Sequence, residues 1–376
     1  MRKKKDKSNS FSNKYDVTLC FCVALATIVG LTAIASATKS LETPKYIVVQ
    51  GVAILIGFLV ILIGMRLNLV SLSKFSPYII CFNILILVLV LFIGTGDEVG
   101  TKGWIRFGSI GIQPSEIVKV MFIFTFAWHI DKVKEKINEI KTLLLLVAHA
   151  GIIIFLVLLQ PDYGTAMVFI TIAIFMLFIA KISCKYIFAT IGTGAVLAPL
   201  LWFFVLKDFQ KNRFFAFLNP EADPLGAGYH VSQSKIAIGS GQIFGKGLFG
   251  GIQTQLGHLP EKQTDFVFAV IGEEFGFIGA IIILILLLLI MIRCFQLAQR
   301  CDNLFAELIC SGVGAMFLFH IFENVGMCIG LTPVTGIPLP FISYGGSSMI
   351  TSLTAIMLVL NLKNDTKYRA IKNNEG

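Results

Sequence analysis

The stretch DFVFAVIGEEFGFIGAIIILILLLLIMI, residues 265–292, is apolar almost throughout and decides the fold class. An apolar run of about 18 residues or more with few charges is typical of a transmembrane helix, because about 20 helical residues cross the hydrocarbon core. Similar runs recur along all 376 residues, of which 56% are hydrophobic and 14% charged. Soluble chains carry about 25% charged residues, so an ordinary soluble enzyme and a disordered protein are excluded. The runs do not alternate as β-barrel strands do, and we predict an all-α polytopic membrane protein.

Ten transmembrane helices are expected in one membrane domain that covers residues 1–376, with a long loop between the seventh and eighth. The expected spans are 15–37, 46–65, 77–94, 114–131, 142–159, 164–180, 186–206, 265–292, 303–330 and 341–362. The first span is too long and apolar for a signal peptide, and we expect it to be retained. The eight cysteines lie in spans or near one end of the bundle, which predicts buried thiols and no disulfide framework.

Basic residues orient this bundle in the membrane. With the N-terminus inside, the inner segments hold 20 Lys and Arg, whereas the short outer loops hold 4. Positive residues favour the cytoplasmic side, so we expect residues 1–14 and 363–376 to be cytoplasmic and segments 95–113 and 207–264 to be extracytoplasmic. The basic N-terminus then acts as an orientation signal, and no nucleic-acid partner is predicted. We expect short helices in 207–264 to lie at the outer interface and fold over the mouth of the bundle.

Ionisable residues inside spans are functional candidates, because each costs about 2.5–3.5 kcal/mol on insertion scales. Glu116 and Lys119 lie three residues apart at the outer start of the fourth span, on one helical face. The alternative to a functional role for these two residues is a purely structural ion pair. Asp265 follows Thr264 at the start of the eighth span, where it either stabilises the helix N-terminus or deprotonates a hydroxyl. Glu273 lies on nearly the same face, as a proton relay or a structural hydrogen-bonding group.

Three other features are weaker candidates. His320 and Glu323 predict an interhelical hydrogen bond rather than a metal or proton site. Lys246 lies in the glycine-rich stretch SKIAIGSGQIFGKGLFGG, residues 234–251, which lacks the spacing of a phosphate-binding P-loop. Its side chain either holds a pyrophosphate or extends to the lipid headgroups. No cluster of residues with metal-ligand spacing occurs in the sequence, so the metal ligands are unassigned.

Four blocks of sequence together resemble one family of bacterial envelope proteins. The blocks are GWIRFGSIGIQPSEIVKV at 103–120, QPDYGTA at 160–166, the long segment 217–280, and TPVTGIPLPFISYGGSS at 332–348. They resemble the SEDS family (shape, elongation, division, sporulation), and within it the RodA elongation branch. The resemblance covers nearly the whole chain and implies ten spans with both termini inside.

The resemblance also implies an activity and a set of site residues. A member of this family is expected to be a peptidoglycan glycosyltransferase of the bacterial inner membrane that polymerises lipid II with a class B penicillin-binding protein. Membrane lipids and other elongation-complex proteins are further expected partners, and Mg²⁺ or Mn²⁺ could assist the pyrophosphate. Asp265 matches the catalytic carboxylate, supported by Glu116 and Lys119. The positions that match other motif residues, or that could contact substrate, are Trp104, Arg106, Asp162, Arg213, Lys246 and Ser343. A lipid II flippase and a non-enzymatic scaffold of the wall-synthesis complex remain alternatives.

Overall fold

A computed structural model of the chain describes residues 16–41, 43–96, 102–107, 110–183 and 226–374, with scattered positions between 185 and 219. These residues are helical apart from loops and one hairpin, in which β1 (Ile105–Phe107) pairs antiparallel with β2 (Ile110–Ile112). The long helices are α2 (Val17–Thr38), α3 (Lys45–Gly64), α5 (Ser76–Ile93), α6 (Pro114–Val133), α7 (Ile140–Leu158), α8 (Tyr163–Ile179), α13 (Val267–Ala298), α14 (Leu304–Ile329) and α15 (Gly346–Asn374). The short helices are η2 (Lys39–Leu41), α4 (Leu69–Leu72), η3 (Ser73–Phe75), η4 (Lys134–Lys136), α11 (Ala227–Ser240) and α12 (Ile252–Gln255).

Local sequence determines where several helices begin and end. Asp16 caps α2 by accepting a hydrogen bond from the Leu19 amide at 2.9 Å, and Asn303 caps α14 by accepting one from the Ala306 amide at 2.8 Å. Such caps satisfy amides that have no partner within the helix. At the other end of α14, Gly330 has a φ of 75°, a conformation that suits glycine.

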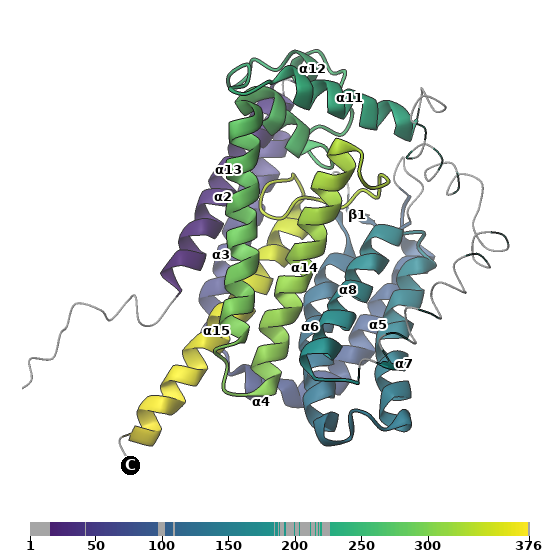
Figure 1. Cartoon of the computed structure of the whole chain (residues 1–376), viewed down its shortest axis with the longest axis vertical. Coiled ribbons are helices and arrows are strands. Elements are labelled where there is room, and N and C mark those ends of the chain that lie inside the picture. Colours follow the sequence, from purple (N-terminus) through teal and green to yellow (C-terminus); the bar gives the residue numbers. More distant parts are fainter. Residues whose placement is uncertain are drawn as a thin grey trace, which may run out of the picture.

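α14 is the central helix of the bundle and packs against α13, α8 and α6. α2 lies beside α13, and α15 packs along α3 (Figure 1). Six described helices are long and apolar enough to cross a membrane, and two shorter apolar segments, 163–179 and 346–362, accompany them. α3 and α5 fully bury few of their apolar side chains, as expected of helices that face lipid.

Nine of the ten expected spans coincide with described helices, and the seventh, 186–206, lies largely outside the described residues. Two expectations need correction. Residues 341–345 are not helical but end the connection between α14 and α15, and α15 continues through Asn374 into the expected cytoplasmic tail. The eighth span also extends further, to Ala298, and is interrupted at Gly276, whose φ of 67° is not helical. None of the seven described cysteines forms a disulfide bond.

One end of the bundle carries most of the irregular structure, and we call it the loop end. α11 and α12 lie across it, at the top of Figure 1, as expected for the described part of 207–264. The start of α13 and the C-terminal end of α14 lie there too. Residues 332–345, which we call the return loop, connect α14 to α15 at this end.

Candidate active site

The first two turns of α6 place a buried ion pair near the loop end. Pro114 occupies the first position of the helix, where its missing amide hydrogen has no consequence. Glu116 and Lys119, three residues apart, then lie on one face, and Lys119 Nζ is 2.8 Å from Glu116 Oε1. The two residues are only 3% and 1% exposed. The predicted pairing is therefore confirmed, in surroundings that screen charge poorly.

Lys119 also contacts His320 of α14, and this contact fixes the state of the imidazole. Lys119 Nζ is 3.0 Å from His320 Nε2, and His320 Nδ1 is 3.1 Å from the carbonyl oxygen of Pro338. A carbonyl only accepts, so Nδ1 carries the hydrogen and Nε2 accepts from the ammonium. We call Glu116, Lys119 and His320 the ion-pair cluster. The expected interhelical bond of His320 is confirmed, but its partner lies 201 residues away, beyond the reach of local sequence patterns.

Asp162 lies near the same cluster. It caps α8, where its Oδ1 accepts from the Thr165 amide at 3.0 Å, and its Oδ2 accepts from Gln113 Nε2 at 3.0 Å. Burial raises the pKa of this carboxyl, while the hydrogen bonds from Thr165 and the positive charge of Lys119 act in the opposite direction. Gln113, the residue before α6, was not singled out in the sequence and connects Asp162 to the start of that helix.

The β1–β2 hairpin lies over the loop that contains Asp162. The Lys102 amide donates to the carbonyl of Gln160 at 3.3 Å. Trp104 packs its ring over Gly111, and Arg106 pairs with Gly111 in the hairpin and has an exposed side chain. The structure thus brings the hairpin residues to the same end as Asp162. Arg213 lies outside the described residues.

Asp265 lies half-buried where the chain enters α13, next to the return loop. A Cβ atom at Gly336, where φ is 76°, would lie 3.4 Å from Asp265 Oδ2, so the carboxylate faces the return-loop backbone. Asn324 Nδ2 of α14 donates to the carbonyls of Asp265 and Ile337, each at 2.8 Å. Sequence reasoning missed Asn324, although its position four residues after His320 places it on the same face of α14.

α14 holds the return loop through three side chains. His320 contacts Pro338, Asn324 contacts Ile337, and Glu323 Oε1 accepts from Thr335 Oγ1 at 2.9 Å. The Asp265 backbone is therefore connected to the ion-pair cluster through α14 and this loop.

Ser343 stabilises the far end of the return loop. Its Oγ accepts from the Leu339 amide at 2.8 Å, and its carbonyl accepts from Gln50 Nε2 of α3 at 3.2 Å. Gln50 Oε1 in turn accepts from the Gly345 amide at 3.1 Å. Gln50 is a second residue that sequence patterns did not identify.

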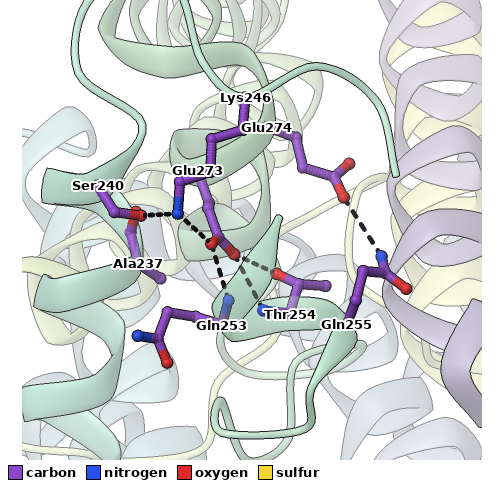
Figure 2. Close-up of polar contacts among 8 residues, drawn as sticks. All are labelled: Ala237, Ser240, Lys246, Gln253, Thr254, Gln255, Glu273 and Glu274. Atoms are coloured by element: carbon purple, nitrogen blue, oxygen red, sulfur yellow. Dashed lines mark hydrogen bonds and ion pairs between the residues drawn. The ribbon is translucent and has the colours of Figure 1, made fainter. Parts of the chain in front are cut away.

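Lys246 contacts a protein carboxylate. Its Nζ lies 2.7 Å from Ser240 Oγ and 3.0 Å from Glu273 Oε1, as Figure 2 shows. The glycine-rich stretch around it is thus attached to α13. Among the described residues, no group of three His, Cys, Asp or Glu side chains could hold a metal ion.

Comparisons with known proteins place this geometry in a family. A family profile described as "Cell cycle protein", covering FtsW, RodA and SpoVE, matches residues 15–368. The peptidoglycan glycosyltransferase MrdB of Escherichia coli K12 is 37% identical over 78% of this chain and 78% of its own length. The probable peptidoglycan glycosyltransferase FtsW of Trichlorobacter lovleyi is 34% identical over 96% of this chain and 97% of its own.

A solved structure supports the same assignment. A chain from a study of how a peptidoglycan synthase complex coordinates polymerization and crosslinking superimposes with a TM-score of 0.80 and 30% identity. The match covers 94% of this chain and 98% of that one. The fold and the site therefore define a polytopic membrane protein with polar groups gathered at one end of its bundle. The chain belongs to the FtsW/RodA/SpoVE family, the SEDS family that its sequence motifs resemble.

Proposed function

We infer that this chain is a peptidoglycan glycosyltransferase that polymerises lipid II during cell elongation. Family membership and the activity named for its relatives support this inference. The observation that carries it is the position of Asp265, a half-buried carboxylate that faces the return loop, whose other contacts include the ion-pair cluster. Lipid II carries its polyprenyl chain in the membrane and its sugars in water, so a polar site at one end of an apolar bundle suits it.

Asp265 acts as the general base in this proposal. It removes the proton from the 4-hydroxyl of one lipid II, and that oxygen attacks the anomeric carbon of the glycan chain with inversion. The bond from the anomeric carbon to the pyrophosphate oxygen breaks, and the polyprenyl pyrophosphate leaves. A carboxylate within hydrogen-bond reach of a hydroxyl is a suitable base for this step.

The ion-pair cluster and the other candidate residues support this chemistry. Lys119, oriented by Glu116 and His320, supplies positive charge that stabilises the negative charge of the leaving group. Arg213 is proposed to assist at the pyrophosphate, and Arg106 to contact the substrate. Mg²⁺ or Mn²⁺ is usually bound through one or two carboxylates together with substrate phosphates, so it would not need a cage of protein ligands.

The proposed setting is the bacterial inner membrane, with both termini cytoplasmic and the loop end extracytoplasmic. The excess of Lys and Arg in the segments at the opposite end supports this orientation. A class B penicillin-binding protein is the proposed partner, because the similar solved chain comes from a complex that coordinates polymerization with crosslinking. A lipid II flippase is the second candidate, since His320 and Glu323 place polar groups inside the bundle.

The test compares glycan strand formation by the wild type and the Asp265→Asn variant. Each purified protein is mixed with lipid II and a divalent cation, with and without a class B partner, and products are separated on a gel. Moenomycin silences contaminating transglycosylases of the other family. Asp302→Asn, an exposed change in the turn between α13 and α14, is the matched control. Polymer from the wild type and the control alone supports the proposal, and polymer from folded Asp265→Asn refutes the role of Asp265.

A further inference from the structure

Residues 242–247 of the glycine-rich stretch fill the interruption of α13 at Gly276, and we call them the glycine-rich loop. At this residue the helical ladder stops, which leaves carbonyls before it and amides after it without helical partners. The carbonyls of Glu273 and Glu274 accept from the amides of Lys246 and Gly247 at 3.0 and 2.9 Å. Backbone groups without a hydrogen-bond partner are costly away from water, so the loop and the interrupted helix stabilise one another.

The same loop supplies carbonyls to the second half of the helix. The amides of Phe277 and Ile278 donate to the carbonyls of Gln242 and Ile243 at 2.8 and 3.2 Å. A side chain at Gly276 would collide with the backbone of this loop. The fit therefore requires glycine at the interruption itself.

Glu273 also binds α12, the short helix that follows the glycine-rich stretch, as Figure 2 shows. Its Oε1 accepts from the Gln253 amide at 2.8 Å and from Lys246 Nζ at 3.0 Å. Its Oε2 accepts from the amide and the hydroxyl of Thr254 at 3.0 and 2.8 Å. The N-cap residue of α12 is Gly251, which has no side-chain oxygen, so Glu273 caps this helix from another segment. All four contacts donate to the carboxylate, which favours the structural interpretation of Glu273 over a proton relay.

A second set of contacts leads from this cap to Asp265. The carbonyl of Thr254 accepts from Lys262 Nζ at 2.6 Å, and the same ammonium donates to Ser40 Oγ at 2.7 Å. Lys262 is buried and lies three residues before Asp265 in the chain. Glu273 is eight residues after Asp265 on α13. Hydrogen bonds through Thr254 therefore connect Lys262 to Glu273, the two residues between which Asp265 lies in the chain.

We propose that Glu273 is a positioning residue for Asp265, acting through Thr254 and Lys262, and that Lys246 is the counter-ion of Glu273 rather than a ligand of the pyrophosphate. This inference rests on the base role proposed for Asp265. In Glu273→Gln one of the two acceptor oxygens becomes an NH2 donor, so α12 loses part of its cap, Lys246 loses its charged partner, and the segment that positions the Asp265 backbone becomes less rigid. A displacement of about 1 Å in a catalytic group lowers rates by up to about 100-fold.

The test is a double-mutant cycle of Glu273→Gln and Lys246→Met, read as initial rates of lipid II polymerisation per folded protein. We expect Glu273→Gln to lower kcat about 10- to 100-fold with KM nearly unchanged, because positioning affects the reacting geometry more than binding. Lys246→Met should lower kcat less, and the double variant should be no slower than Glu273→Gln. Glu307→Gln is the matched control: it makes the same change in the first turn of α14, at the end of the bundle opposite the loop end, and should keep the wild-type rate.

Two outcomes overturn the inference. A wild-type kcat in folded Glu273→Gln would refute the positioning role of Glu273. If the two substitutions lower the rate independently, so that their effects multiply in the double variant, and Lys246→Met raises KM, then Lys246 binds the substrate instead. If Glu273→Gln does not fold, Thr254→Val tests the same contact by removing one of the four donors, and an unchanged kcat then refutes the inference. An active Asp265→Asn variant instead refutes the base role of Asp265. Failure of that role is therefore distinguishable from failure of the positioning role of Glu273.

Discussion

Removing the ammonium of Lys119 tests whether the buried ion pair contributes to stability, to catalysis or to both. At the observed 2.8 Å the attraction between the two charges is about 6 kcal/mol with an effective dielectric constant of about 20. Burial of each ion costs several kcal/mol in the opposite direction, so the intact pair contributes little net stability, about 0–2 kcal/mol. Lys119→Met leaves the Glu116 carboxylate buried without that partner. The expected loss in unfolding free energy is about 3–5 kcal/mol.

The double variant Glu116→Gln/Lys119→Met separates stability from function. With both charges gone, most of the lost stability should return, to within about 1–2 kcal/mol of the wild type. Polymerisation should stay low, because the positive charge proposed to stabilise the leaving pyrophosphate is missing. Unfolding in detergent and lipid II polymerisation per folded protein are measured on the same preparations.

The chain provides a matched control at the C-terminal end of the same helix, where Asp131 of α6 pairs with Lys134 of η4. Lys134 and Asp131 have the same three-residue spacing and an Nζ–Oδ1 distance of 3.2 Å, but their side chains are 53% and 36% exposed. Lys134→Met should change stability by less than about 1 kcal/mol. Wild-type stability in Lys119→Met would refute the electrostatic argument. Recovery of both stability and activity in the double variant would mean that the pair is only structural.

Three further predictions concern the segments that surround Asp265. Asn324→Ala removes the amide donor from the carbonyls of Asp265 and Ile337, and leaves the Asp265 carbonyl only the weak thiol donor of Cys328 at 3.7 Å. Each lost bond costs about 1–3 kcal/mol, so the variant should lower both the melting temperature and the polymerisation rate, and an unchanged melting temperature would contradict this. Gly276→Ala should destabilise the protein by about 1–3 kcal/mol and expose the glycine-rich loop to protease, whereas Gly151→Ala, with open space around it, should not. Burial lowers the pKa of Lys262 below its ordinary 10.5, so the unfolded chain binds this proton more tightly and stability should rise with pH through the folded-state pKa. The Lys262→Met variant should lack that rise, measured by thermal unfolding over the pH range just below the ordinary lysine pKa of 10.5.

The helices were predictable from the sequence because the membrane restricts the possible structures. A run of about 20 apolar residues has to form a helix in lipid, since its backbone groups find no other partners. The Glu116–Lys119 pair was predictable for a similar reason, because spacing along one helix is local information. The interruption of α13 was not predictable, although Gly276 lies in the opening stretch. Its φ is tolerable only because residues 242–247, which precede it by about thirty positions, supply the missing hydrogen bonds.

The roles of the polar residues within the bundle depend on contacts that the sequence does not reveal. Glu273, His320 and Glu323 were functional candidates only because ionisable residues are costly to insert into a membrane, and on that basis a lipid II flippase remained an alternative. In the described structure each of them holds an irregular segment at the loop end: Glu273 the cap of α12, and His320 and Glu323 the return loop. A path for a lipid headgroup needs polar groups that release one set of partners for another along the membrane normal. These side chains are instead engaged by backbone and side-chain groups that fix the segments around Asp265, an arrangement that favours a preorganised reaction site over a flippase.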